Sequence, residues 1–349
     1  MGRGLYSNGD APRPASKSTE VVASGAGTRW PLTRIRGNRY RGAVMTARHH
    51  YLHLDVFTPS PLSGNQLAVF LEPPAWPDAT MQAIAREMSF SETTFVYPPV
   101  RGGSLAQVRI FTPGGELPMA GHPTIGTTFA LAHHDRIPHG TRHITLDLGV
   151  GPTQVDLEWD GAAKRLRFAW MTQPPPAFGP VFKNREDVAR SLGLEVGDLA
   201  PELPVQIVSC GVPFAYVPLV SHHAIDHVAV DRSAWQRTCA ANSVDEHMIF
   251  AFSIDDATTT PVRLYSRMFA PLMGVTEDPG TGGASGPLGA YLVHHGVVSG
   301  RVCEFLSHQG VKMHRPCEIS IRIESDGKDI NRVQIGGTAT VAGEAWLRL

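Results

Sequence analysis

The sequence predicts an α+β protein built from two similar halves. Three observations support this prediction: an internal repeat, the same order of strands and helix in both halves, and a length of 349 residues, for which two domains are the usual organisation. In the repeat, Arg109-Ile-Phe-Thr-Pro113 matches Arg267-Met-Phe-Ala-Pro271, which lies 158 residues later. Each copy leads through a run of small residues into an apolar segment typical of a buried helix.

The first half contains alternating and β-branched segments that predict strands, and apolar residues at helical spacing that predict two helices. The strands are expected at 53–57, 66–71, 93–97, 108–111, 144–148, 155–159 and 166–171. One helix is expected to start at an Asp78 N-cap and to end near Met88. The other is expected around Pro123, which suits a first helical turn, and to continue through Leu131.

The Pro174-Pro-Pro176 run marks the expected crossing into the second half. There we expect helices at 186–192 and 286–294, and strands at 205–208, 215–219, 248–253, 262–269, 319–323, 332–335 and 338–347. The predicted organisation is therefore an N-terminal half at 49–173 and a C-terminal half at 174–349, with strands, a glycine-rich turn, a helix and further strands in each.

Residues 1–48 differ in composition from the rest of the chain. They hold nine Lys and Arg but only two acids, Asp10 and Glu20, among many Gly, Ser, Pro and Ala. We expect a disordered extension, or a start assigned too far upstream of Met45. An organelle transit peptide is the alternative, and a secretory signal is not expected because an apolar core segment is lacking.

Composition excludes several classes of function. The net charge of −1 gives no support for nucleic acid or an anionic membrane as a partner, and no apolar run is long enough to span a bilayer. The four cysteines, Cys210, Cys239, Cys303 and Cys317, show no paired or metal-type spacing, which favours reduced thiols in a cytoplasmic protein. No metal cluster and no nucleotide-binding glycine motif is recognisable, so no cofactor and no metal are expected.

The small-residue runs that follow the two repeats are the first candidate for a site. One run is Ala120-Gly121-His122 and the other is Asp278-Pro-Gly-Thr281-Gly282-Gly283. Helix N-termini present unpaired N–H groups and the positive end of the helix dipole. Two of them facing each other would bind a carboxylate or an enolate-like anion.

Three side chains near these runs could carry chemistry. Glu92 lies between a helix and a strand, flanked by Phe90 and Phe95, so its pKa should be raised and it could move a proton; a surface glutamate is the alternative. His122, near a helix N-terminus, should stay neutral and could donate a hydrogen bond, or it could merely cap the helix. Asp278 could hold a substrate amine or hydroxyl, or act as a plain N-cap, and both roles are compatible.

Five ordered motifs over roughly residues 51–349 resemble the phenazine biosynthesis PhzF-like proteins. These motifs are Asp55-Val-Phe-Thr58 with Gly64-Asn65, Ser89-Phe-Ser-Glu92, Arg109 through the Gly121-His122 pair, Glu277-Asp-Pro-Gly-Thr-Gly-Gly283, and Gln309-Gly310 with Arg315-Pro316. The resemblance implies the diaminopimelate epimerase fold, in which each half is a sheet wrapped around a central helix and the active site lies between the halves. It also implies a homodimer.

The resemblance assigns roles to the candidate residues. Glu92 matches the catalytic glutamate, while His122 and Asp278 match residues that hold and polarise the substrate. Gly121, Thr281, Gly282 and Gly283 would bind the substrate through backbone N–H groups. Three positions depart from the usual pattern: Gly283 replaces a common Ser, Gln66 a common Pro, and His314 a common Gly.

Epimerases and racemases of this fold use two cysteines, one from each half. The offset of 158 residues puts those positions at Ala120 and Asp278, and neither is Cys. A one-base mechanism centred on Glu92 is therefore expected. The predicted function is a cofactor-independent isomerase that acts on a small cyclic carboxylic acid resembling trans-2,3-dihydro-3-hydroxyanthranilate. The alternatives are an isomerase or epimerase of another small amino or hydroxy acid, and a binding protein without turnover.

Overall fold

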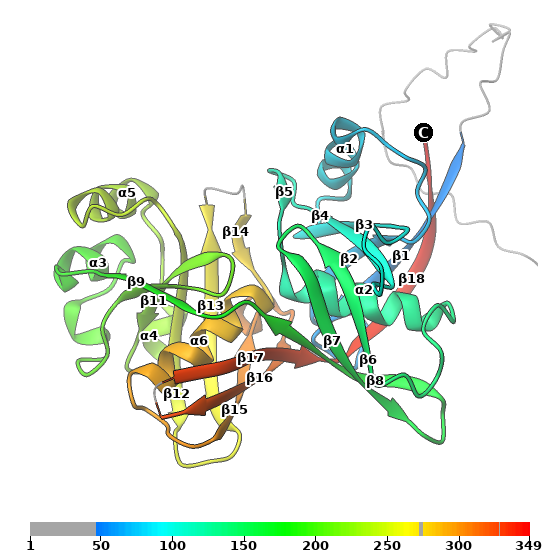
Figure 1. Ribbon diagram of the computed structural model, residues 1–349. Coiled ribbons are helices and arrows are strands. Elements are labelled where there is room, and N and C mark those ends of the chain that lie inside the picture. Colours follow the sequence, from blue (N-terminus) through cyan, green and yellow to red (C-terminus); the bar gives the residue numbers. More distant parts are fainter. Residues whose placement is uncertain (1–46, 272–274, 328) are drawn as a thin grey trace, which may run out of the picture. The chain divides into compact units, whose positions relative to one another are not determined.

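The computed structural model describes residues 47–271, 275–327 and 329–349, and Figure 1 shows how their helices and strands are arranged. The predicted extension, residues 1–48, lies outside the described residues except for its last two positions. Arg48 already begins the first strand.

The first half contains every strand and helix that was expected there, with ends shifted by a few residues. Its elements are β1 (Arg48–Val56), β2 (Asn65–Phe70), α1 (Asp78–Met88), β3 (Glu92–Tyr97), β4 (Ala106–Phe111), β5 (Glu116–Leu117), α2 (Gly121–His133), β6 (His143–Leu148), β7 (Gly151–Asp160) and β8 (Arg165–Gln173). The prediction of Asp78 as N-cap was wrong: Pro77 holds that position without a side-chain cap, and Asp78 is the first helical residue.

The second half has more helices than were expected. Its elements are β9 (Ala177–Val181), α3 (Arg185–Ser191), η1 (Val196–Asp198), β10 (Gln206–Ser209), β11 (Pro213–Pro218), α4 (His222–Asp226), α5 (Arg232–Ala241), β12 (Met248–Asp256), β13 (Val262–Ala270), β14 (Val275–Asp278), α6 (Gly282–His294), β15 (Val302–Gln309), η3 (Val311–Met313), β16 (Cys317–Asp326), β17 (Asp329–Gly337) and β18 (Ala339–Arg348).

Seven elements of this half escaped prediction, namely β9, η1, α4, α5, β14, β15 and η3. In α5 only Trp235, Thr238 and Cys239 are buried, so its apolar periodicity is weak, although Asp231 caps it by accepting a hydrogen bond from the N–H of Ala234. Strand β15 alternates buried and partly exposed residues and could have been found from that pattern. Helix α6 begins at Gly282, four residues before the predicted start at 286. The sequence placed the start too late because glycine has low helix propensity.

The two halves share one strand topology. In the first, β1 pairs antiparallel with β2, β2 runs parallel to β3, β3 is antiparallel to β4, β4 runs parallel to β6, and β7 and β8 follow. In the second, β10, β11, β12, β13, β15, β16 and β17 repeat these pairings and directions. Strand β8 pairs with β17, so one continuous set of strands joins the halves. The predicted pseudo-symmetry is confirmed.

The outermost strand of each half is added to the repeated strands, by a segment that precedes them in the second half and by one that follows at the C-terminus in the first. Strand β9 lies beside β10, and the C-terminal β18 returns to pair with β1 over nine registered positions from Arg48↔Arg348 to Val56↔Ala339. Figure 1 shows the red C-terminal strand running beside the blue first strand. The division of the chain into halves at residue 173 stays a prediction. Strand β18 lies in the predicted C-terminal half of the sequence, yet it completes the sheet of the first half by pairing with β1.

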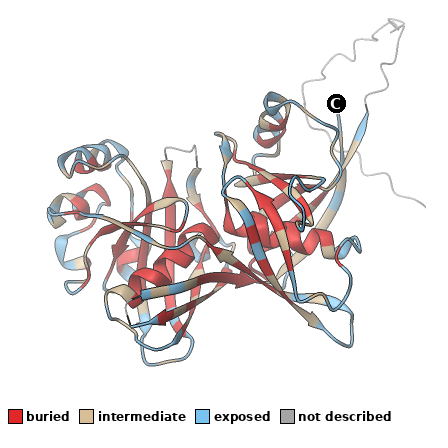
Figure 2. Cartoon of the chain, viewed as in Figure 1, coloured by how far each residue is buried: buried red, intermediate tan, exposed pale blue. Residues whose placement is uncertain are grey.

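Helices α2 and α6 form the centres of the two halves. The residues from Gly121 to Leu131 and from Gly282 to Val293 are all buried, and Figure 2 shows both helices in red inside their sheets. Helix α2 packs on β1, β2 and β8, and α6 packs on β10, β16 and β17. Among the described residues, no helix is both long and apolar enough to cross a membrane.

Candidate active site

The N-termini of α2 and α6 meet in direct backbone contact. A Cβ atom at Gly121 would lie 2.5 Å from the carbonyl carbon of Gly282, and one at Gly282 would lie 3.1 Å from Cα of Gly121. A side chain at Gly121 would therefore drive the helices apart. The first N–H groups of a helix have no carbonyl group one turn earlier in the same helix to accept from them. The contact therefore brings two such helix starts together, as the two small-residue runs predicted.

Each half stabilises the turn before its helix with an arginine. Arg109 makes a bidentate ion pair with Glu116, at 2.7 and 2.5 Å, and Arg267 makes the same pair with Glu277, at 2.9 and 2.8 Å. Each guanidinium also lies over a phenylalanine two residues later, at 5.1 Å for Phe111 and 4.7 Å for Phe269. The sequence repeat is thus a structural repeat that fixes where each central helix begins.

The offset between the halves changes from 158 to 161 residues between the strands and the helices. Arg109 and Arg267 are 158 apart, whereas Glu116 and Glu277 are 161 apart, as are the helix starts at 121 and 282. Ala120 therefore corresponds to Thr281, since both are N-caps. The alignment of Ala120 with Asp278 was wrong, because the second half carries three more residues from Phe269 to Glu277 than the first carries from Phe111 to Glu116.

A cavity of about 60 Å³ lies at this junction. It is lined by residues of both halves, namely Ser91, Glu92, Thr112, Leu117, Met119, Ala120, Gly121, His122, Val212, Phe214, Met248, Met268, Ala270, Val275, Asp278, Thr281, Gly282 and Gly283. All seven residues predicted for the site are among them. The lining includes no lysine or arginine, so the backbone N–H groups are its source of positive potential for an anion.

Glu92 and His122 face each other across the cavity. Oε2 of Glu92 lies 3.2 Å from Nε2 of His122, and their side chains are 14% and 3% exposed. Despite this distance, both atoms are buried without a hydrogen-bond partner of good geometry in the described structure. Buried polar groups are normally satisfied, so two facing unsatisfied atoms mark the place where a ligand group would bind.

Asn65 connects His122 to Asp278, and sequence reasoning did not assign it a role at the site. Its Nδ2 lies 3.1 Å from Nδ1 of His122, 2.9 Å from Oδ1 of Asp278 and 3.0 Å from the carbonyl oxygen of Gly280. An amide nitrogen only donates, so the tautomer of neutral His122 that accepts from Asn65 at Nδ1 carries its proton on Nε2, the ring nitrogen nearest to Glu92. The Gly64-Asn65 pair in the first motif was the sequence signal that could have indicated a role for Asn65, but it was used only to support the family resemblance.

Asp278 is held by further donors. Ser91 Oγ donates to its Oδ1 at 2.7 Å, and Thr281 Oγ1 donates to its Oδ2 at 2.5 Å. The backbone N–H of Thr281 donates a hydrogen bond to Oε1 of Gln309 at 3.0 Å. The expectation that this N–H is free for substrate was therefore wrong, and the N–H groups of Gly282 and Gly283 remain the donors of that helix.

Burial sets the protonation of the facing pair. Loss of water raises the pKa of the Glu92 carboxyl well above its ordinary value, and the negative charge of Asp278 raises it further. Burial lowers the pKa of His122 to about 4, although the charge of Asp278 opposes this shift. His122 is therefore neutral at pH 7, as expected, but burial rather than the helix dipole is the dominant cause.

The second half offers no equivalent of Glu92. In strand β3 Thr93 pairs with Phe111, and in strand β12 Ile249 pairs with Phe269, so the position matching Glu92 is Met248. Met248 lines the cavity beside other apolar residues of that half, which are Val212, Phe214, Met268, Ala270 and Val275. One wall of the cavity thus carries the titratable side chains of Glu92 and His122, and the opposite wall is apolar.

None of the four cysteines lines the cavity. All are buried, and burial raises the pKa of Cys210 to about 12 and that of Cys239 to about 11, with upward shifts at Cys303 and Cys317 as well. Such thiols stay protonated near neutral pH. The cavity therefore offers no thiol to a two-cysteine mechanism, and the absence of that mechanism stays a prediction, although the alignment that first suggested it was wrong.

A sequence profile described as "Phenazine biosynthesis-like protein" matches residues 54–345, which is most of the chain. The chain belongs to the phenazine biosynthesis PhzF-like family. It is 36% identical over 250 residues to trans-2,3-dihydro-3-hydroxyanthranilate isomerase of Pseudomonas fluorescens, covering 72% of this chain and 82% of that protein. An uncharacterized isomerase of Clostridium acetobutylicum is 32% identical over 253 residues, covering 72% and 81%. The chain is accordingly an isomerase.

Solved structures of the PhzF-like family share the fold. A PhzF family protein of Bacillus anthracis matches with a TM-score of 0.76 at 25% identity, over 87% of this chain and all of that one. A predicted epimerase of Pseudomonas aeruginosa matches with a TM-score of 0.71 at 30% identity, over 86% and 99%. A probable proline racemase of Agrobacterium radiobacter, at 12% identity and a TM-score of 0.60, shows the shared epimerase-like fold alone.

One of the three departures from the usual PhzF-like motifs, Gly283, lies in the site. Gly283 lines the cavity, and a Cβ atom there would meet nothing within 4 Å, so the position has room for a side chain. Gln66 points elsewhere: its Nε2 lies 3.2 Å from Nε2 of His53. His314 ends the short helix η3 in a left-handed conformation with φ of 55°, where glycine is the usual residue.

Proposed function

We propose that this PhzF-like isomerase moves a proton along the ring of a small cyclic amino or hydroxy carboxylic acid related to trans-2,3-dihydro-3-hydroxyanthranilate. The relative from Pseudomonas fluorescens, at 36% identity, carries that activity in its name. The observation that carries the proposal is the facing pair of unsatisfied atoms, Glu92 Oε2 and His122 Nε2, at the joint of the two halves.

In the proposed mechanism Glu92 is the only acid and base. Its carboxylate takes a proton from one ring carbon, and the resulting carboxylic acid returns a proton to another ring carbon. Nothing is oxidised or reduced, and product and substrate have the same composition. The raised pKa brings Glu92 closer to the working pH, which favours both directions of the transfer. The apolar Met248 at the matching position of the other half supports a one-base route.

The other polar groups bind and polarise the substrate. The Nε2–H of neutral His122 donates to a substrate oxygen or nitrogen, and the carboxylate of Asp278 accepts from an amine or hydroxyl. The first-turn N–H groups around Gly121, Gly282 and Gly283 hold the substrate carboxylate. The apolar wall around Met248 and Phe214 packs against the ring.

The test is deuterium incorporation from solvent, followed by NMR, with trans-2,3-dihydro-3-hydroxyanthranilate and a panel of small amino and hydroxy acids. Wild type should incorporate deuterium into at least one compound and isomerise it. In Glu92→Gln the rates of both reactions should fall by about 10²- to 10⁴-fold. Glu87→Gln, at an exposed glutamate of α1 that does not line the cavity, serves as the matched control and should keep the wild-type rate.

Two outcomes would count against the proposal. Exchange by Glu92→Gln at the wild-type rate would remove Glu92 from the mechanism. Tight binding of a panel compound without any exchange would favour a binding protein that kept the fold. A homodimer and a cytoplasmic location stay predictions, and light scattering of the purified chain would test the first.

A further inference from the structure

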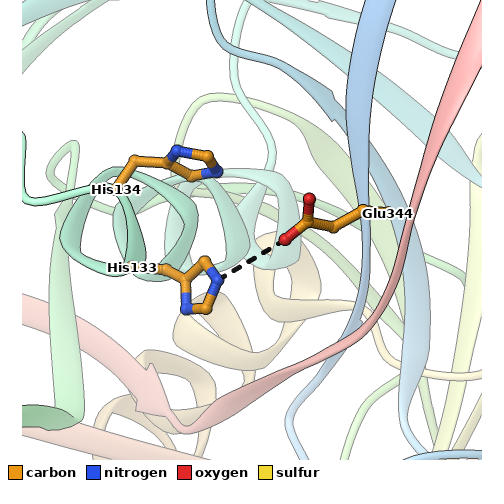
Figure 3. A group of neighbouring side chains, drawn as sticks. All are labelled: His133, His134 and Glu344. Carbon is orange, nitrogen blue, oxygen red and sulfur yellow. Dashed lines mark ion pairs between the residues drawn. The ribbon is translucent and has the colours of Figure 1, made fainter.

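A second cluster of chemically versatile side chains lies at the far end of α2. His133 is the last residue of that helix and His134 is its C-cap, while Glu344 lies on β18. One ligand atom from each of the three lies within 4.8 Å of the others, and all three residues are exposed. Figure 3 shows the two imidazoles at the helix end with the carboxylate of Glu344 beside them.

A fourth residue orients the carboxylate. Nε2 of His50, on β1, lies 3.1 Å from Oε2 of Glu344, whereas Nε2 of His133 lies 3.9 Å from Oε1 of the same group. The ring of His50 is 5.9 Å from that of His134. Both carboxylate oxygens thus have imidazole neighbours, and one oxygen is held by His50 while the other faces the helix end.

These residue types suit a borderline divalent ion. Imidazole nitrogens and a carboxylate are ordinary ligands of Zn²⁺, and a site with three protein ligands leaves room for water. Tetrahedral ligands at about 2.0–2.1 Å from zinc lie roughly 3.4 Å apart. Small rotations of exposed side chains would close the observed 4.8 Å to that spacing.

The position of the cluster favours a cation for a second reason. The carbonyl groups at the end of α2 carry the negative end of the helix dipole, which attracts positive charge. His50 would serve as the outer partner that fixes the carboxylate, as is common around bound metals. Sequence motifs could not show this site, because its ligands come from the end of α2 and from β18, and its outer partner His50 comes from β1. Only the pairing of β1 with β18 and the packing of α2 bring these segments together.

We propose that His133, His134 and Glu344 bind a divalent transition-metal ion of the Zn²⁺ class, which fastens the C-terminus of α2 to β18. None of the three residues lines the cavity that holds Glu92. The ion is therefore structural, and it closes the sheet of the first half around its central helix by joining the last strand of the chain to that helix. This inference is independent of the proposed reaction.

The test is titration of the metal-free, untagged full-length protein with Zn²⁺ and Co²⁺ by calorimetry, together with melting temperatures. Wild type should bind one ion per chain through this cluster, and Zn²⁺ at one hundred times its Kd should raise the melting temperature by roughly 4 °C. Co²⁺ should show visible absorption bands of a nitrogen- and oxygen-ligated ion.

Three variants decide the outcome. Glu344→Gln and His133→Ala should each weaken binding by at least about tenfold and abolish the thermal shift, because each removes a ligand. His143 is an exposed histidine of β6 outside the cluster, so His143→Ala should change neither the affinity for the ion nor the shift in melting temperature. Absence of binding by wild type, or equal affinity in all four proteins, would overturn the proposal, the latter by assigning the ion to other surface histidines. Melting curves without metal verify that each variant is folded.

Discussion

Gly121 and Gly282 touch backbone to backbone where the central helices of the two halves begin. A Cβ atom on Gly121 would lie 2.5 Å from the carbonyl carbon of Gly282, closer than real contacts allow. This contact places the N-termini of α2 and α6 on one cavity, and it brings Glu92 and His122 of the first half within reach of Asp278 of the second.

Gly121→Ala is expected to destabilise the protein by about 1–3 kcal/mol and to reduce activity, because the methyl group would push the two helix starts apart. Gly283→Ala is the matched control, since a Cβ there meets nothing within 4 Å. Urea unfolding of both variants measures the difference. Equal stability of the two would mean that the helix contact tolerates more space than its geometry implies.

Glu92→Gln is expected to be more stable than wild type above neutral pH. The pKa of Glu92 is raised by burial and by Asp278, so the folded state favours the protonated form. The shift makes protonated Glu92 contribute to the free energy of unfolding. This contribution is complete below the ordinary carboxyl pKa range and is lost as the pH rises through the raised pKa. Melting temperatures should therefore coincide at low pH and separate as pH increases. A separation that shrinks with rising pH would contradict the sign.

The pH profile of kcat/KM is expected to depend on Asp278. Activity should rise with pH as Glu92 loses its proton, and this acid limb should lie above the ordinary carboxyl range. Asp278→Asn removes a negative charge that raises the pKa of Glu92, so the limb should move to lower pH even as the rate falls. A limb that stays in place would show that the two carboxylates are not coupled.

Thiol reagents are expected to leave the native enzyme active. The four cysteines are buried and outside the cavity, and their pKa values are raised. Iodoacetamide at neutral pH should therefore label the native protein slowly, with full activity retained. The same reagent on unfolded protein, counted by mass spectrometry, supplies the control. Inactivation in step with labelling of one cysteine would reopen a thiol mechanism.

Arg267→Met is expected to cost far more stability than Arg109→Met. The side chains of Arg267 and Glu277 are 10% and 14% exposed, so removing the arginine leaves a buried charge, at a cost of about 3–5 kcal/mol. Arg109 and Glu116 are 22% and 39% exposed, and an exposed pair contributes about 1 kcal/mol or less. Denaturant unfolding compares the two. Similar losses would indicate that the repeat contributes equally in both halves.

The strand and helix pattern of the first half could be read from the sequence because most of its elements carry clear periodicity. Strands such as 93–97 and 144–148 alternate or are rich in β-branched residues, and their ends were nearly correct. Helix α5 and the start of α6 were missed or shortened, since one has a narrow buried face and the other is rich in glycine. Local propensity is weak in both, and tertiary packing decides their conformation.

The candidate site was predictable in its residue types and not in its contacts. Glu92, His122 and Asp278 stand out by motif, yet Asn65, which bridges the last two, is one polar residue among many until the fold brings it there. The three-residue change in offset between the halves could not be located either, because only the Arg267–Glu277 pair and the start of α6 show where the second half is longer.

By itself the sequence determined that the chain has two similar halves, that a run of small residues leads into the central helix of each, and that no cysteine stands in those runs. These properties depend on local periodicity and on the order of motifs. The tertiary structure alone decided that Met248 opposes Glu92, that β18 returns to β1, and that His133, His134 and Glu344 meet. Strand pairing over hundreds of residues sets these relationships, and a sequence pattern carries no record of which distant strands pair.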